Sequence, residues 1–159
     1  MSQVIAAIST APQPGAIGIL RLSGDGAIAV ADRVFTAASG KPLADTADRR
    51  LVLGSLHDTQ GRVLDQVLAT VSRAPHSYTG EDTAELHCHG SLAVLAAGLQ
   101  ALFAAGAQQA GPGEFTKRAF LNGCLDLSQA EAVIDLIEAD TAEAAANAAG
   151  QLSGAVRSR

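Results

Sequence analysis

The sequence predicts an α+β domain, with a mixed β-sheet and packed helices, followed by a long C-terminal α-helix. Three observations indicate this class. Short apolar runs typical of strands alternate with segments of helical periodicity, one pair of these runs is joined by a hairpin-type turn, and the last segment is rich in alanine. With 159 residues the chain can bury a large core without disulfide bonds.

The N-terminal part is predicted to contain two strands and a helix. Val4–Ile8 and Ile17–Leu22 are apolar runs of strand length, and residues 9–18 hold two prolines and two glycines, which favours an irregular loop. Residues 25–35 show helical spacing. The apolar stripe of that helix comprises Ala27, Val30, Ala31 and Val34.

The middle of the chain is predicted to form a hairpin and a further strand. Leu51–His57 and Val63–Arg73 are the two strands of the hairpin, and Asp58–Gly61 is its turn. A polar loop at 76–82 then leads to the strand Ala84–His89.

Ser91 is predicted to cap an amphipathic helix that Gly106 ends. Its predicted apolar face comprises Leu92, Leu95, Ala96, Leu99, Leu102 and Phe103. A short helix is expected over 114–121, after Gly111–Gly113 breaks the chain.

The last predicted helix begins with a capping-box pattern, Ser128 and Glu131, and runs to about Ala149. An apolar face of this length has to pack on the body of the domain, on another subunit, or on a part of a longer protein that the chain does not contain.

Composition excludes several classes of protein. A hydrophobic fraction of 48% and a charged fraction of 17% exclude generic disorder. Eleven basic against sixteen acidic residues argue against an autonomous nucleic-acid binder. Two cysteines are too few for a disulfide scaffold, no run of 18 apolar residues predicts a membrane span, and Met1–Thr10 lacks the basic start of a signal peptide. We therefore expect a cytoplasmic setting and no membrane partner.

Arg21 is the one charge within an apolar predicted strand. Burying a charge is costly unless it is paired. Arg21 could hold a carboxylate of a ligand, or it could form a salt bridge or emerge on a solvent-facing sheet surface.

Glu85, His87 and His89 alternate with apolar neighbours, so period two places them on one face of a strand and Cys88 on the other. That geometry disfavours a metal site built from the adjacent histidines and the cysteine. The polar face could be merely solvated, or Glu85 could accept hydrogen bonds from adjacent N–H donors such as those of an aminopyrimidine or pterin edge.

Motifs of two common enzyme classes are absent from the sequence. There is no GxSxG nucleophile elbow and no GxxxxGK[ST] phosphate loop. Cys124 is predicted to be inert, because only Lys117 and Arg118 bring positive charge near it in the sequence.

Three segments together carry a family resemblance: GAIGILRLSG at 15–24, YTGEDTAELHCHG at 78–90, and GPGEFTKRAFLNGCLDLSQAEAVIDLIEA at 111–139. The chain resembles the N-terminal part of the tRNA modification GTPase family MnmE (TrmE). The resemblance implies a folate-binding and homodimerising domain of the aminomethyltransferase type at 1–120, and the start of a helical domain at 121–159. The GTPase domain, with its potassium and magnesium, is expected in a part of the protein that this chain does not contain, so this piece should not turn over alone.

The resemblance also implies a cofactor and partners. The cofactor would be a tetrahydrofolate derivative, 5-formyltetrahydrofolate or 5,10-methylenetetrahydrofolate, which serves as one-carbon donor. The partners would be a second copy of the chain, the flavoprotein MnmG (GidA) and, through the intact complex, tRNA modified at C5 of the wobble uridine.

The folate contacts of the family map onto Arg21, Glu85 and Cys124. The family's segment LN.KLDL commonly has a lysine where Cys124 stands. Cysteine brings neither the charge nor the three donors of an ammonium group. An alternative is therefore a dimerisation and interaction module with weak or no folate binding. A free-standing aminomethyltransferase-like enzyme is disfavoured, because the sequence shows no substrate site or catalytic acid of its own.

Overall fold

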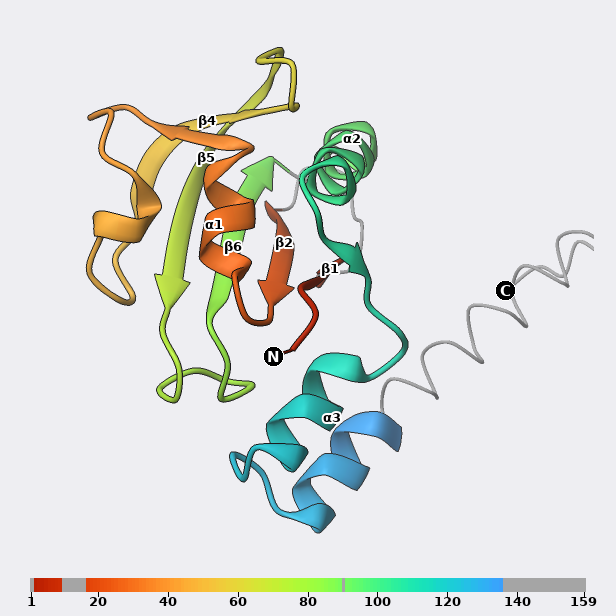
Figure 1. The fold of residues 1–159 in the computed structure, drawn as a ribbon. Helices are drawn as coiled ribbons and strands as arrows, with labels where there is room; N and C mark the ends of the chain where they lie inside the picture. Colours follow the sequence, from red (N-terminus) through yellow and green to blue (C-terminus); the bar gives the residue numbers. More distant parts are fainter. Residues whose placement is uncertain (1, 10–16, 90, 136–159) are drawn as a thin grey trace, which may run out of the picture. The chain divides into compact units, whose positions relative to one another are not determined.

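A mixed β-sheet forms the centre of the first part of the chain (Figure 1). The computed structural model describes residues 2–9, 17–89 and 91–135. Within these residues the sheet has the strand order β3-β4-β5-β6-β2-β1-β7. All neighbours are antiparallel except β1 and β7, which run parallel. The strands are β1 Ile5–Ile8, β2 Ile17–Ser23, β3 Phe35–Ala37, β4 Val52–His57, β5 Val63–Ser72, β6 Thr83–His89 and β7 Gln108–Gln109. The predicted α+β class with a mixed sheet is confirmed.

Two helices, α1 (Ala27–Asp32) and α2 (Leu92–Ala104), pack on one face of the sheet (Figure 1). Alternate residues of the central strands turn toward them and are fully buried. These are Leu20 and Leu22 of β2 and Ala84 and Leu86 of β6. The opposite face of the sheet carries no helix in the described part of the first unit, and apart from the buried Ile5 and Ser23 its side chains are half-buried or exposed.

Contacts divide the chain into two compact units, Met1–Ala110 and Gly111–Arg159. The sheet, α1 and α2 belong to the first unit. The second unit contains α3 (Glu114–Leu121) and a helical segment that begins at residue 127. The predicted functional boundary between 120 and 121 stays a prediction.

The structure corrects the predicted end of the first helix. The helix was expected to run to residue 35, but α1 ends at Asp32 and Phe35 begins β3. The Asp32 carboxylate accepts hydrogen bonds from the backbone N–H groups of Leu43, at 2.7 Å, and Ala44, at 3.2 Å. These bonds fix the short 3-10 helix η1 (Leu43–Asp45) beside α1, where the sequence predicted no element.

The start of α2 is as predicted, but its buried face is not. The Ser91 hydroxyl accepts a hydrogen bond from the backbone N–H of Val94 at 3.4 Å, which confirms the cap. Leu92 and Ala96 are exposed, although they were expected in the core. The buried face of α2 includes Gly98, which lies against Leu20. A Cβ at Gly98 would lie 2.7 Å from Leu20 Cδ1, so the helix packs too closely there for a side chain.

The cap of the last helix is also different from the prediction. Asp126 and Gln129 form a reciprocal capping box: the Asp126 carboxylate accepts from the Gln129 backbone N–H at 2.7 Å, and the Gln129 amide oxygen accepts from the Asp126 N–H at 2.9 Å. The expected pair, Ser128 and Glu131, therefore lies inside the helix rather than at its start. The remainder of the predicted helix, to Ala149, lies outside the described residues.

A search of the described residues for membrane spans found no helix that combines the required length and apolar character.

We predict that Gly54→Ala destabilises the first unit. A Cβ at Gly54 would lie 2.4 Å from the Thr36 carbonyl oxygen and 2.5 Å from Phe35 Cζ, so β3 would have to move away from β4. Overpacking of this kind costs about 1–3 kcal/mol. Urea unfolding followed by circular dichroism should show a lower midpoint. The control Ser55→Thr, on the other face of the same strand, keeps the hydroxyl that accepts a hydrogen bond from Gln66 and should stay within about 0.5 kcal/mol of wild type. An unchanged midpoint for Gly54→Ala would contradict the close packing of β3 on β4.

Candidate functional site

A row of polar side chains crosses the central strands on the face away from the helices. Arg21 of β2 stands directly opposite Glu85 of β6, and Glu85 stands opposite Thr70 of β5. Directly opposite residues of antiparallel strands point to the same face. The register of the sheet therefore brings together Arg21 and Glu85, which are 64 residues apart in the sequence.

Glu85 is the centre of an ion cluster. Arg21 Nε donates to Glu85 Oε2 at 3.0 Å, and Arg21 Nη2 lies 2.9 Å from the same oxygen. His87 Nε2 lies 3.0 Å from Glu85 Oε1. Of the interpretations of Arg21, the structure therefore shows the salt bridge, and its partner is the other charge that the sequence singled out.

The cluster holds the Glu85 carboxyl in its charged form. Burial raises the pKa of Glu85, but the hydrogen bond from His87 and the charge and hydrogen bond of Arg21 outweigh burial and leave the pKa below its ordinary value. Glu85 is therefore a hydrogen-bond acceptor at neutral pH.

Tyr78, in the loop between β5 and β6, adds an aromatic wall beside the cluster. Arg21 Cζ lies 5.9 Å from the centre of the Tyr78 ring, within the range of a cation–π contact. The loop is tied to the end of β2, because Ser23 Oγ lies 2.7 Å from Thr79 Oγ1 and donates to Glu81 Oε1 at 2.7 Å. These bonds position Tyr78 without a ligand.

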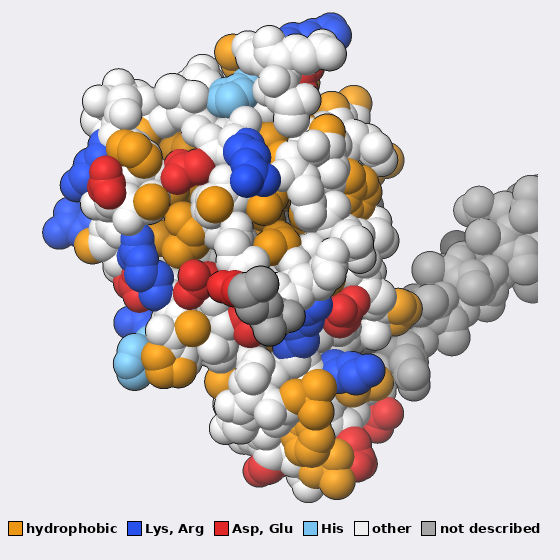
Figure 2. All heavy atoms as spheres, viewed as in Figure 1, with side chains coloured by type: hydrophobic (Ala, Val, Ile, Leu, Met, Phe, Trp, Pro, Cys, Tyr) orange, Lys and Arg blue, Asp and Glu red, His pale blue; other side chains and the backbone are white. Residues whose placement is uncertain are grey.

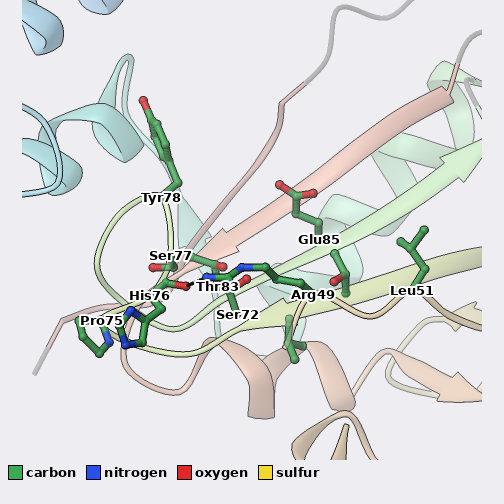
Figure 3. Close-up of a pocket in the computed structure, with 11 residues that line it drawn as sticks. Arg49, Leu51, Ser72, Pro75, His76, Ser77, Tyr78, Thr83 and Glu85 are labelled. Carbon is green, nitrogen blue, oxygen red and sulfur yellow. Dashed lines mark hydrogen bonds between the residues drawn. The ribbon is translucent and has the colours of Figure 1, made fainter. Parts of the chain in front are cut away.

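A cleft of about 640 Å³ opens next to Glu85 (Figure 3). Strand residues of β5 and β6 form its floor, and the loop that carries Tyr78 forms one wall. The lining residues are Arg49, Leu51, Thr70, Val71, Ser72, Pro75, His76, Ser77, Tyr78, Thr83 and Glu85. A volume of several hundred Å³ with a few polar groups is typical of a small-molecule site.

The alternation predicted for β6 is confirmed. Ala84, Leu86 and Cys88 are buried on the helix side, whereas Glu85 and His87 are half-buried on the other. Burial raises the pKa of the Cys88 thiol to about 12, and the charge of Asp65 adds to the shift. Cys88 is therefore a core residue, and among the described residues no group of three His, Cys, Asp or Glu side chains is placed to hold a metal ion.

Cys124, the third residue of the predicted site, belongs to the second unit and is exposed there. Of the nearby basic residues, Arg118 forms an ion pair with Glu114 at 3.2 Å. The structure therefore brings together two of the three predicted site residues, Arg21 and Glu85, within one unit.

Sequence reasoning missed the other side chains of the site. Period two placed His87 on the same face as Glu85, but it did not reveal that the two are bonded. Nothing in the sequence singled out Arg49 or Tyr78, because their places in the cleft depend on loop conformations that no periodicity encodes.

The surface charge of the helix-covered face is mixed. Figure 2 shows Lys and Arg side chains interspersed with Asp and Glu over this face, with hydrophobic side chains between them. Extended binding of a phosphate backbone requires a basic surface. The described part of this face does not offer one.

Comparison with known proteins identifies what the chain resembles. The family model described as "GTP-binding protein TrmE N-terminus" matches residues 4–124. Proteins named tRNA modification GTPase MnmE are similar over nearly the whole chain. The protein from Symbiobacterium thermophilum is 49% identical over 98% of this chain and 34% of its own length. The protein from Geobacillus kaustophilus is 52% identical over 94% of this chain and 33% of its own length. The protein from Carboxydothermus hydrogenoformans is 48% identical over 100% of this chain and 35% of its own length. The chain thus spans about a third of the length of these curated relatives.

We predict that Glu85 contributes stability that is lost in acid. Because its pKa is lower in the folded chain than the ordinary value of 4.5, the contribution is complete above pH 4.5 and disappears as the pH falls through the folded-state pKa. The free energy of unfolding, measured by urea titration between about pH 6 and about pH 3, should therefore fall less in Glu85→Gln than in wild type. The control Glu131→Gln, at an exposed position of the second unit, should keep the wild-type slope. Equal slopes for wild type and Glu85→Gln would contradict the ionised cluster.

Proposed function

The chain belongs to the family of the TrmE N-terminal domain, and from that premise we propose that it is the tetrahydrofolate-binding and homodimerising part of a GTPase that modifies tRNA. The observation that carries the folate part of the proposal is the ionised Glu85 carboxylate at the edge of a cleft of about 640 Å³. The fold supports it as well, since an α+β domain with a mixed sheet is the class expected for a folate-binding domain of the aminomethyltransferase type.

The acceptor sites of Glu85 suit a ring edge that carries N–H donors. An ionised carboxylate has about four lone-pair sites. Oε2 receives two N–H groups of Arg21, and Oε1 receives His87. Oε1 thus keeps one site, and displacement of His87 would free a second. A pterin edge presents a ring N–H and an amino group, and one of these donors would bind the site that remains on Oε1.

Arg21 and Tyr78 complement this contact. Arg21 holds the carboxylate in place and ionised, and its positive charge favours a ligand acceptor such as a ring carbonyl. The exposed Tyr78 ring offers an apolar surface for a flat heterocycle. The bound folate would supply a one-carbon group for C5 of the wobble uridine, and the residues of this chain would bind and orient it.

The remaining parts of the proposal follow from the family. The relatives are about three times as long as this chain, and they are named tRNA modification GTPases. We propose that GTP hydrolysis, with potassium and magnesium, occurs in a domain outside this chain. We also propose that the whole protein works in the cytoplasm with the flavoprotein MnmG and tRNA.

A second candidate function is a dimerisation and interaction module that binds folate weakly. It is favoured by Cys124, which stands where the family commonly has lysine and cannot supply a charged donor.

We predict that calorimetric titration with 5-formyltetrahydrofolate shows saturable binding to the chain, and that Arg21→Gln and Glu85→Gln each weaken it roughly tenfold or more. The reason is that a hydrogen bond to a charged group contributes ~1.5–3 kcal/mol. The controls Arg62→Gln and Glu131→Gln make the same chemical changes at exposed positions that do not line the cleft, and they should leave the dissociation constant unchanged. No binding by folded wild-type chain, or equal binding by all four variants, would refute the folate site.

Cys124→Lys separates the two candidate functions. If the cysteine weakens a folate site that is otherwise intact, restoring the ammonium group should tighten binding by roughly tenfold, as expected for a charge-assisted contact. Cys124→Met, which adds length without charge, should not. Weak binding that Cys124→Lys leaves unchanged would favour the interaction module.

A further inference from the structure

Arg49, in the lining of the cleft, has an unusual backbone conformation. Its φ is 61°, and among the described residues no other non-glycine residue has a positive φ. The left-handed region is uncommon for a long side chain, and such a residue persists only where its surroundings impose it. The conformation of Arg49 therefore needs a structural cause.

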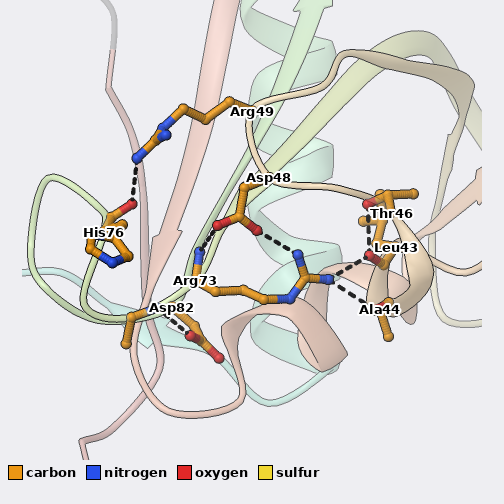
Figure 4. A network of polar contacts seen from close by, with 9 residues as sticks. Leu43, Ala44, Thr46, Asp48, Arg49, Arg73, His76 and Asp82 are labelled. Atoms are coloured by element: carbon orange, nitrogen blue, oxygen red, sulfur yellow. Dashed lines mark hydrogen bonds and ion pairs between the residues drawn. The ribbon is translucent and has the colours of Figure 1, made fainter.

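A network of polar contacts provides that cause (Figure 4). The Arg49 backbone N–H donates to the Val71 carbonyl of β5 at 2.8 Å. The preceding residue, Asp48, accepts from the Arg73 backbone N–H at 3.1 Å and forms an ion pair with its guanidinium. Arg73 also donates to the Ala44 carbonyl at 2.9 Å. The loop before β4 is thereby fixed to the end of β5 and to Arg73, the residue that follows it.

The network directs the Arg49 side chain into the cleft rather than into an ion pair. Arg49 Nη2 donates to the His76 carbonyl at 3.1 Å, and Figure 3 shows the side chain extended toward His76 and Ser77. A guanidinium has five N–H donors. This is its one hydrogen bond within the described part of the chain, and the nearby Asp48 carboxylate is bonded to Arg73 instead. Arg49 is exposed, so its other donors can reach a ligand.

The two charges of the cleft are opposite in sign and separated. Arg49 reaches the end of the cleft formed by the loop with His76. Glu85 enters the cleft from β6, whereas Arg49 enters it from the loop before β4. One end of the cleft therefore accepts N–H donors, and the other offers a planar cation that suits a carboxylate.

We propose that Arg49 binds the carboxylate of the glutamate tail of the folate. The inference rests on the proposed function, because it assumes that the ring of the same ligand binds at Glu85. A folate carries N–H donors on its ring at one end and glutamate carboxylates at the other. This order of charges is complementary to that of the cleft, and Arg49 thereby selects a tailed folate over a free pterin.

The test compares two ligands by calorimetric titration of the 159-residue chain. One is 5-formyltetrahydrofolate, and the other is the primary amide of 5-formyltetrahydropteroate, which has the same ring and aminobenzoyl group but no carboxylate. Arg49→Gln should weaken binding of the folate roughly tenfold or more and leave binding of the pteroate amide within about twofold. The matched control is Arg50→Gln, since Arg50 is the next residue, is exposed and does not line the cleft. It should change neither constant.

A second variant keeps the test informative if Arg49→Gln fails to fold. Arg49→Gly removes the guanidinium but adopts a positive φ without strain, so its thermal unfolding midpoint should be at least that of wild type while folate binding is lost as in Arg49→Gln. If the variants bind folate as wild type does, or lose both ligands equally, the tail site is refuted and the ring site at Glu85 stands. If wild type binds neither ligand, the proposed function itself fails.

Discussion

The register of β6 between β5 and β2 is the constraint on which the rest of the first unit depends. It places Leu86 and Cys88 in the core under the helices and Glu85 on the opposite face, beside Arg21. A slip by one residue would exchange the two faces, exposing leucine and burying an unpaired carboxylate. Burial of apolar residues on one side of the sheet therefore also fixes the position of the polar cluster on the other, and no separate interaction is needed to bring Arg21 to Glu85.

The ion cluster stabilises the folded chain only in comparison with the same groups unpaired, and not in comparison with an apolar alternative. A partly buried ion pair loses hydration that its Coulomb energy repays only in part, and apolar residues of similar size are often as stable. Arg21 and Glu85 have side chains that are 31% and 26% exposed, so water still reaches them. What the pair does provide is a carboxylate with a fixed position and a fixed charge at the edge of a cleft. That property is useful for recognising a ligand with N–H donors, and it fits a binding role better than a structural one.

The sequence could predict those parts of the fold that a periodic pattern determines. The period-two alternation of β6, the cap of α2 at Ser91 and the α+β class are of this kind, and so is the assignment of Arg21 and Glu85 as residues of interest. The elements that the sequence did not predict, β3, η1 and β7, are two or three residues long. β3 and β7 form because a strand elsewhere in the sequence pairs with them, and η1 is held by the Asp32 carboxylate. The caps show a related limit: Ser128 and Asp126 both begin acceptable capping boxes, and the choice between them depends on where the preceding loop ends.

Arg49 shows most clearly why part of the site cannot be predicted from the sequence. In the sequence it is one of two adjacent arginines in a polar segment, and nothing distinguishes it from Arg50. In the structure the ion pair of Asp48 with Arg73 and the bond from Arg49 to Val71 hold it in a strained conformation at the cleft, while Arg50 is merely exposed. Strain of this kind costs of order 1–3 kcal/mol. Since the same network could hold the loop with a glycine at this position, the fold alone does not account for an arginine there. The proposed contact with a ligand carboxylate would require its positive charge in the cleft.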